Sequence, residues 1–213
     1  MLKEHKRTLI ITSIVTILPI LIGVFFWNRL PDVMATHFGT DNEANGFTGK
    51  VFAVFGLPLI LLAVEWFAAF VTANDPKKQN ISPKMFDFVL WIIPVVSLFG
   101  AATIYPYNLG YQTDITFLAE LLIGAVFIVV GNYLPKARQN YTIGIRIPWT
   151  LANEENWNRT HRLAGYLWVT GGILMIIAAL TGIVKPQWML AIFILLVLVP
   201  FVYSYWLHVK RNL

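Results

Sequence analysis

Long apolar runs alternate with short polar segments along the whole chain, and this pattern predicts the fold. A helix needs about 20 apolar residues to cross the roughly 30 Å hydrocarbon core of a bilayer. Backbone polar groups must be paired within such a segment, and the runs lack the strict alternation of a barrel strand. The pattern therefore predicts an all-α membrane protein, a bundle of six transmembrane helices at residues 8–27, 51–73, 86–106, 115–133, 163–184 and 187–207.

Composition agrees with this class. Hydrophobic residues make up 57% of the 213 residues and charged residues 13%, whereas roughly a quarter of residues in soluble proteins are charged. The net charge of +5 comes from basic residues between apolar runs, as membrane topology requires, so direct nucleic-acid binding is not expected. The chain has no cysteine, which excludes disulfides and cysteine-ligated metal. We expect no cofactor.

The distribution of Lys and Arg predicts the orientation. Thirteen of the sixteen fall on one side of the six predicted crossings, and only Arg29, Lys50 and Lys185 fall on the other. Positive charges mark the cytoplasmic side of a membrane protein. Both termini and the loop at 134–162 are therefore expected in the cytoplasm.

The same pattern suggests two parts. Residues 1–80 would form a two-helix unit with an outer loop at 28–50, and residues 81–213 a four-helix unit with the cytoplasmic loop 134–162.

The outer loop is polar and rich in turn-forming residues, among them Gly39 and Gly46. We expect a solvated loop that packs on the outer rim through Leu30, Pro31 and Phe38. Its chelating side chains give only a weak metal signal, because oxygen ligands accompany a single histidine; they are His37, Asp41 and Glu43. No metal site is expected.

Two carboxylates, Glu65 and Glu120, fall inside predicted spans. A charge near the bilayer centre costs several kcal/mol, so Glu65 should face the bundle interior and be protonated or paired. It would act in a proton relay or cavity, or make a structural contact to Asn132 or an inner-loop arginine. Glu120, close to a helix end, is expected to reach water. Pro58, Pro94 and Pro200 should kink their helices.

The longest polar stretch, residues 131–165, carries the most diverse side chains. Residues 141–150 read as an extended or turn-rich strap, because the residue before Pro148 is biased away from helix. Asn153 is a predicted N-cap of a helix that continues into the fifth span. Within it, Glu155 precedes Arg159 by four residues, the favourable order for an ion pair. One helix face would carry Trp157, His161, Ala164, Gly165 and Trp168.

Two interpretations of this stretch remain open. In the first, the stretch is an interfacial elbow, with Trp149 and Trp157 at headgroup depth. Alternatively, it is a specific functional site, in which arginines bind phosphates of anionic lipids or approach Glu65; these are Arg146, Arg159 and Arg162. His161 would be either a pH-responsive group or a hydrogen-bonded elbow residue.

Residues 144–165, GIRIPWTLANEENWNRTHRLAG, resemble the signature of the SdpI family of bacterial immunity membrane proteins. The matching positions are Gly144, Arg146, Pro148, Trp149, Thr150, Leu151, Asn153, Trp157, Thr160, His161, Arg162 and Gly165. The outer loop is similar to the small domain of unknown function that often precedes this signature, at Pro31, His37, Gly39 and Gly46.

The resemblance implies a multi-pass protein of the bacterial cell membrane that protects the cell against a secreted antimicrobial peptide toxin. It also implies signalling, in which the toxin-occupied protein sequesters a cytoplasmic transcriptional repressor. The expected partners are thus a peptide toxin, anionic lipids and a repressor.

Two other functions are weighed against this one. Residues 154–159 have the Glu-Glu-x-x-x-Arg form of membrane-embedded CAAX-type proteases. Those enzymes need further histidines at membrane depth, and the four histidines here lie at or outside span ends: His5, His37, His161 and His208. We therefore expect no enzymatic activity. The second alternative, a small proton-coupled exporter, depends on Glu65.

Overall fold

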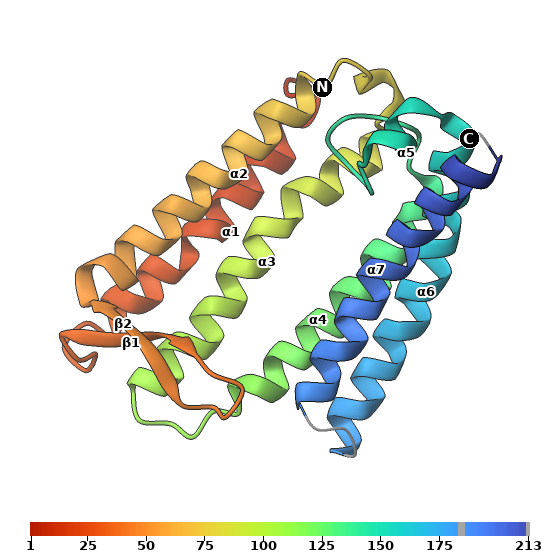
Figure 1. Ribbon diagram of the computed structural model, residues 1–213. Helices are drawn as coiled ribbons and strands as arrows, with labels where there is room; N and C mark the ends of the chain where they lie inside the picture. Colours follow the sequence, from red (N-terminus) through yellow and green to blue (C-terminus); the bar gives the residue numbers. More distant parts are fainter. Residues whose placement is uncertain (183–185, 212–213) are drawn as a thin grey trace. The chain divides into compact units, whose positions relative to one another are not determined.

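The computed structural model describes residues 1–182 and 186–211 and is mostly helical (Figure 1). Within these residues, six helices are long and apolar enough to cross a membrane, so the predicted set of spanning helices is confirmed. They are α1 (Lys6–Phe25), α2 (Leu57–Ala73), α3 (Pro83–Asn108), α4 (Ile115–Tyr133), α6 (Glu154–Thr181) and α7 (Pro186–Arg211). The expected end of the fifth span at residue 184, and Lys185, lie outside the described residues.

The chain divides into two compact units, residues 1–74 with 83–115 and residues 75–82 with 116–213. The expected division after residue 80 differs from this one. Helix α3 packs on α1 and α2 and so belongs to the first unit. The short segment between α2 and α3, including the 3₁₀ turn η2 (Lys78–Asn80), belongs to the second.

The outer segment of the first unit is a β-hairpin and not only a loop. Strand β1 (Val33–Phe38) pairs antiparallel with β2 (Ala44–Gly49), with irregular register on both sides of His37. Each strand has only six residues, and glycines interrupt β2, so the sequence shows turns more clearly than strands. The reversal uses Asn42 at a φ of 65°, a conformation that Asn tolerates better than most residues.

The hairpin is fixed to the end of α3. The Asn108 side chain pairs with the backbone of Ala35, accepting from its N–H and donating to its carbonyl oxygen, both at 2.9 Å. Phe38 packs edge-on against Tyr107, with ring centroids 4.8 Å apart. Leu30 and Met34 are buried in the same unit. Of the three residues expected to pack on the rim, Leu30 and Phe38 do so, whereas Pro31 is exposed.

Helix α2 does not begin as a regular α-helix. A π-helical turn, η1 (Phe52–Gly56), precedes it, and Pro58 lies in its first turn. Proline is tolerated there because the first helical N–H groups have no partner within the helix. The proline expected to kink the second span instead follows a change of helix type. Pro94 and Pro200 lie inside α3 and α7.

Glu65 of α2 is buried, with 1% of its surface exposed. Its carboxylate accepts hydrogen bonds from Thr16 at 2.6 Å and from Ser13 at 3.5 Å, both on α1. Ser97 of α3 donates to the Thr16 carbonyl oxygen at 2.7 Å. The polar contact expected with Asn132 or an arginine is thus made by α1 hydroxyl groups. This network joins the three helices of the first unit.

Glycines bring α4 and α6 together in the second unit. A Cβ atom on Gly165 would lie 2.9 Å from the Gly131 carbonyl oxygen, and one on Gly172 would lie 2.5 Å from that of Gly124. Small residues allow such close helix packing in membranes. Trp168 of α6 in turn donates to the Leu196 carbonyl oxygen of α7 at 2.7 Å. Glu120 of α4, expected to reach water, is half-buried.

Candidate functional site

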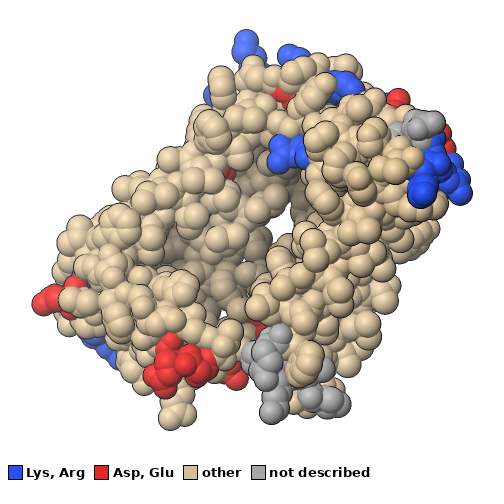
Figure 2. All heavy atoms as spheres, in the orientation of Figure 1, with Lys and Arg blue, Asp and Glu red and all other residues tan. Residues whose placement is uncertain are grey.

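The signature residues form one end of the second unit. Helix α4 ends in a 3₁₀ turn, η3 (Leu134–Lys136), followed by an irregular strap at residues 137–147, the short helix α5 (Pro148–Ala152) and then α6. We call residues 75–82 and 137–165 together the signature cap. Its surface in the second unit is basic, with Lys and Arg side chains visible there in Figure 2. The exposed ones include Lys78, Arg138, Arg146 and Arg162.

A stacked ring pair lies at the centre of the signature cap. Trp157 and His161 are one helical turn apart on α6, with ring centroids 4.0 Å apart and planes inclined by 21°. Trp157 is fully buried, and its indole N–H donates to the Ala137 carbonyl oxygen at 2.7 Å. Trp157 therefore holds the start of the strap. It is an internal packing residue, not the headgroup-depth anchor expected from the sequence.

His161 connects α6 to the strap. Its Nδ1 lies 2.8 Å from the Trp157 carbonyl oxygen, and its Nε2 lies 2.9 Å from the Ile145 backbone nitrogen. A carbonyl oxygen can only accept and a backbone N–H can only donate, so the geometry requires the neutral tautomer with hydrogen on Nδ1. Of the two predicted roles for His161, the geometry fits the hydrogen-bonded elbow residue.

Gly144 leaves room for this contact. Its φ is +117°, a conformation that L side chains rarely adopt. A Cβ atom there would lie 2.4 Å from His161 Nε2 and 3.1 Å from the Trp157 ring. The signature glycine is thus required both by its backbone conformation and by the rings behind it.

Residues 148–152 are helical, although the sequence predicted an extended or turn-rich strap as far as residue 150. Pro148 is the first residue of α5, a favourable place because its fixed φ suits a helix start. Thr150 stabilises the turn. Its hydroxyl accepts from the Ile147 N–H at 3.0 Å and donates to the Ile145 carbonyl oxygen at 2.8 Å. The bias against helix before proline thus applied to Ile147 and not beyond it.

The start of α6 agrees with the sequence prediction. The Asn153 side chain caps the helix by accepting from the Asn156 N–H at 2.9 Å. Glu155 and Arg159 form the predicted i, i+4 ion pair on the surface. The residues predicted to share one helix face do so, and that face is turned inward: Trp157, His161, Ala164 and Gly165 are buried and Trp168 is half-buried.

Asn156 joins α6 to α7. It is fully buried. Its amide donates to the Ser204 carbonyl oxygen at 3.0 Å, and its oxygen accepts from the Ser204 hydroxyl at 2.6 Å. Thr160 donates to the same oxygen at 3.1 Å. Signature residue Thr160 therefore supports the link between α6 and α7 by donating to Asn156, a residue that the sequence analysis did not single out.

Asp75 is a second residue that the sequence analysis missed. It is 2% exposed, and it accepts from the Tyr141 N–H at 2.9 Å, the Thr142 hydroxyl at 2.8 Å and the Lys77 N–H at 2.7 Å. A carboxylate in a polar connecting loop resembles any solvated charge in the sequence. No local signal shows that this loop folds onto Tyr141, 66 positions later.

The strap is held along its length by two further buried amides, Gln139 and Asn140. Gln139 donates to the carbonyl oxygens of Thr150 and Leu151 at 2.8 and 3.0 Å, and its own oxygen accepts from Lys77. Asn140 accepts from the backbone N–H groups of residues 142 and 143. The strap is therefore hydrogen-bonded throughout and not an open loop.

Few of the signature side chains remain available for a partner. Arg146 is exposed and donates to the Tyr141 carbonyl oxygen at 2.8 Å. Arg162 is exposed, and Arg159 pairs with Glu155. Trp149 packs on α7 against Phe201, Tyr205 and His208. The structure brings the other signature residues together as packing and hydrogen-bonding groups.

The predicted outer-loop residues His37, Gly39 and Gly46 make close contacts within the hairpin. His37 Nδ1 lies 2.5 Å from Asn45 Oδ1 on the paired strand. Its partner in the register is Gly46, where a Cβ atom would lie 2.7 Å from His37 Cβ. A Cβ atom on Gly39 would lie 2.5 Å from Asp41 Oδ1. In residues 1–182 and 186–211, no group of three His, Asp or Glu side chains is placed to hold a metal ion.

Comparisons with known proteins agree with the sequence resemblance. Residues 136–204 match the model of the SdpI/YfhL protein family, and residues 14–62 match a domain of unknown function, DUF1648. The chain is 26% identical over 200 residues to the protein named Immunity protein SdpI of Bacillus subtilis (strain 168), covering 92% of this chain and 91% of that one. No solved structure matches the chain. The chain is thus a multi-pass bacterial cell-membrane protein with an SdpI/YfhL-family region behind a DUF1648 region, and its resemblance to the SdpI family is confirmed.

Proposed function

We propose that this chain is a membrane immunity protein that protects its cell against a secreted antimicrobial peptide toxin. The observation that carries the proposal is the near full-length match to an immunity protein, together with a folded signature cap. The function needs binding and conformational response, without an enzymatic step. In the proposed orientation both termini and the signature cap face the cytoplasm, because Lys and Arg concentrate there.

The exposed arginines of the signature cap are the proposed contact points. Arg146 is anchored through one nitrogen to a strap carbonyl oxygen and retains the other N–H donors of its guanidinium group. Such a group binds phosphates of anionic lipids or carboxylates of a cytoplasmic protein. The second partner class is the one needed for signalling, in which a toxin-occupied protein sequesters a transcriptional repressor.

A proton-coupled exporter is the second function considered, and Glu65 is its central residue. Its buried carboxylate is held by hydroxyl groups of α1, which gives it a structural role in joining helices. Proton-driven flux in vesicles that disappears in Glu65→Gln would favour export over capture.

A protection assay tests the proposal. The chain is expressed in a toxin-sensitive strain that is challenged with candidate envelope-active peptides, and growth is compared with the empty vector. Arg146→Ala and His161→Ala should reduce protection at equal membrane abundance. Arg138→Ala, an exposed arginine on the same strap outside the signature positions, is the matched control and should protect normally. Equal protection by all three variants would refute the assignment of a protective role to the signature cap.

A further inference from the structure

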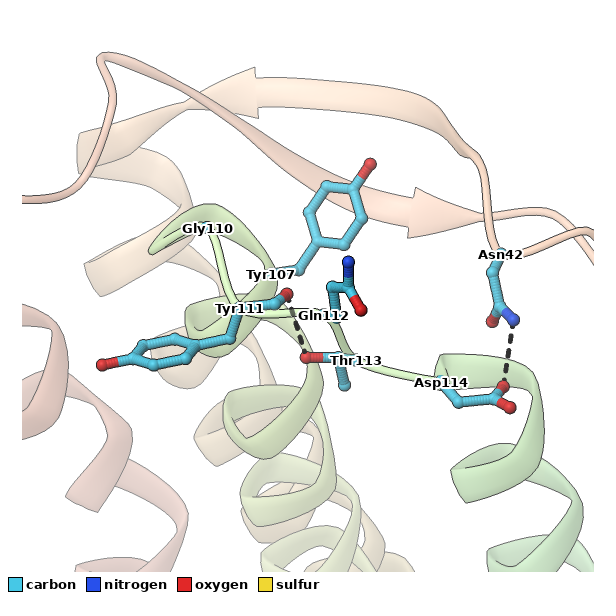
Figure 3. A pocket seen from close by; sticks show the side chains of 7 residues that line it. All are labelled: Asn42, Tyr107, Gly110, Tyr111, Gln112, Thr113 and Asp114. Carbon is cyan, nitrogen blue, oxygen red and sulfur yellow. Dashed lines mark hydrogen bonds between the residues drawn. The ribbon is translucent and has the colours of Figure 1, made fainter.

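An open pocket of about 630 Å³ lies in the first unit beside the turn of the hairpin (Figure 3). Its walls come from the end of α3, from the segment before α4 and from the hairpin turn. The lining residues are Asn42, Tyr107, Gly110, Tyr111, Gln112, Thr113 and Asp114. None of these belongs to the signature cap, and the proposed function so far gives them no role.

The pocket walls are held in place by hydrogen bonds between its own residues. Asn42 of the hairpin turn donates to the Asp114 carboxylate at 3.0 Å, and this bond closes one side of the pocket (Figure 3). The Tyr107 ring is fixed by Phe38 of β1. The docked hairpin therefore completes one wall of the pocket through Asn42.

The surface around this pocket is acidic. The turn at residues 39–44 and the segment at 109–115 contain Asp41, Glu43 and Asp114 and no Lys or Arg. All three carboxylates belong to exposed residues. The hairpin's own lysine, Lys50, is 2.9 Å from Asp32, so its charge is already matched. A protein with a net charge of +5 thus presents a locally negative site.

Aromatic and apolar groups accompany these charges. Tyr111 of the pocket wall is 59% exposed, and on the hairpin strands, outside the pocket lining, Phe47 and Val33 are each 62% exposed. Tyrosine rings bind apolar side chains and the faces of cations. The combination of carboxylates, phenol rings and exposed apolar side chains matches a ligand that is both cationic and apolar.

We propose that this pocket is the capture site for a cationic amphipathic peptide, whose basic side chains meet Asp114, Asp41 and Glu43 and whose apolar face meets Tyr111 and the hairpin. The assignment rests on the proposed function, because it names where the toxin is bound and which chemistry recognises it. Carboxylates around a pocket also speed the arrival of a cation by electrostatic attraction.

Direct binding tests the proposal without the natural toxin. The full chain is placed in nanodiscs of zwitterionic lipid, so that the membrane itself does not attract cations. A labelled synthetic Lys/Leu amphipathic peptide is titrated, and a Glu/Leu peptide of the same pattern serves as the comparison. The Lys/Leu peptide should bind more tightly than to empty discs, with an affinity that falls as salt is raised.

The variants locate the site. Neutralising the three carboxylates (Asp41→Asn, Glu43→Gln and Asp114→Asn) should weaken binding roughly tenfold, as expected for the loss of three exposed ion pairs. Tyr111→Ala should also weaken it. Glu4→Gln, which removes an exposed carboxylate at the other end of α1, is the matched control. Unchanged binding in the triple variant, or equal binding of the Glu/Leu peptide, would overturn the proposal.

The protection assay separates this proposal from the one on which it rests. If the triple variant protects fully while Arg146→Ala does not, the immunity function stands and the capture site is refuted. If the intact chain never protects but binds the peptide through these residues, the capture site stands and the immunity function is refuted.

Discussion

Replacing Gly144 by Ala tests the centre of the signature cap. The substitution places a Cβ atom at a φ of +117°, and such backbone strain costs about 1–3 kcal/mol. The same atom would lie 2.4 Å from His161 Nε2, so the strap must move and the Ile145 to His161 hydrogen bond is lost, at about 1 kcal/mol. The expected loss of stability is roughly 2–4 kcal/mol.

The matched control is Gly182→Ala in the same unit. Gly182 has a φ of +63° with nothing within 4 Å of its Cβ position, so the change introduces strain without a steric conflict. Its cost should be about 1–2 kcal/mol. In thermal unfolding of the purified protein in detergent, followed by tryptophan fluorescence, Gly144→Ala should lower the midpoint by roughly 10 °C and Gly182→Ala by roughly 4 °C.

A double-mutant cycle with His161→Ala identifies the cause. Removing the imidazole frees the space that the added Cβ atom would need, so Gly144→Ala should cost about 1 kcal/mol less in that background. Two results would refute the reasoning: a midpoint for Gly144→Ala no lower than for Gly182→Ala, or strict additivity of the two substitutions.

Three other substitutions test separate parts of the structure. Asp75→Ala leaves two backbone N–H groups and a hydroxyl without their acceptor, so trypsin should cleave the strap faster than in wild type; Asp75→Asn should be intermediate, and equal rates would argue against this anchor. Asn156→Leu should destabilise by about 2–4 kcal/mol and by much less in a Ser204→Ala background, as measured by detergent unfolding midpoints; additive costs would contradict the α6 to α7 link. Glu65→Gln keeps an acceptor for Thr16 and should protect cells as wild type does; loss of protection at normal abundance would favour the exporter.

The parts of the fold that depend on residues close together in the sequence were predictable. Apolar runs of helical length gave the six spanning helices, because the bilayer imposes both length and backbone pairing. The Asn153 cap and the Glu155 to Arg159 pair were likewise readable, since each involves residues within one helical turn.

What the sequence could not show are contacts between distant segments. Asp75 and Tyr141 are 66 positions apart, and Trp157 looked like an interfacial anchor because its acceptor, the Ala137 carbonyl oxygen, carries no sequence signal. The hairpin was missed because its strands are short and contain glycine. Glu65 was expected to face the bundle interior and to be protonated or paired; it is buried, but its hydrogen-bond partners, Thr16 and Ser13, are ordinary residues in an apolar helix.

The signature itself combines two kinds of position. Gly144, Thr150, Trp157 and His161 maintain the shape of the cap, and a motif search alone gives them the same weight as Arg146. The structure separates them because, of these five residues, Arg146 alone is exposed and has guanidinium donors beyond its bond to the Tyr141 carbonyl oxygen. Substitutions at the first four should lower stability and function together, whereas Arg146→Ala should lower function alone.

Both proposals require the hairpin outside the cell and the signature cap inside it, and side-specific labelling tests this most directly. The chain has no cysteine, so single cysteines at Phe47 and Asn158, both exposed, can be probed in intact cells with a membrane-impermeant thiol reagent. We expect labelling of Phe47→Cys in intact cells, and of Asn158→Cys only after the membrane is permeabilised. Labelling of Asn158→Cys in intact cells would contradict this orientation.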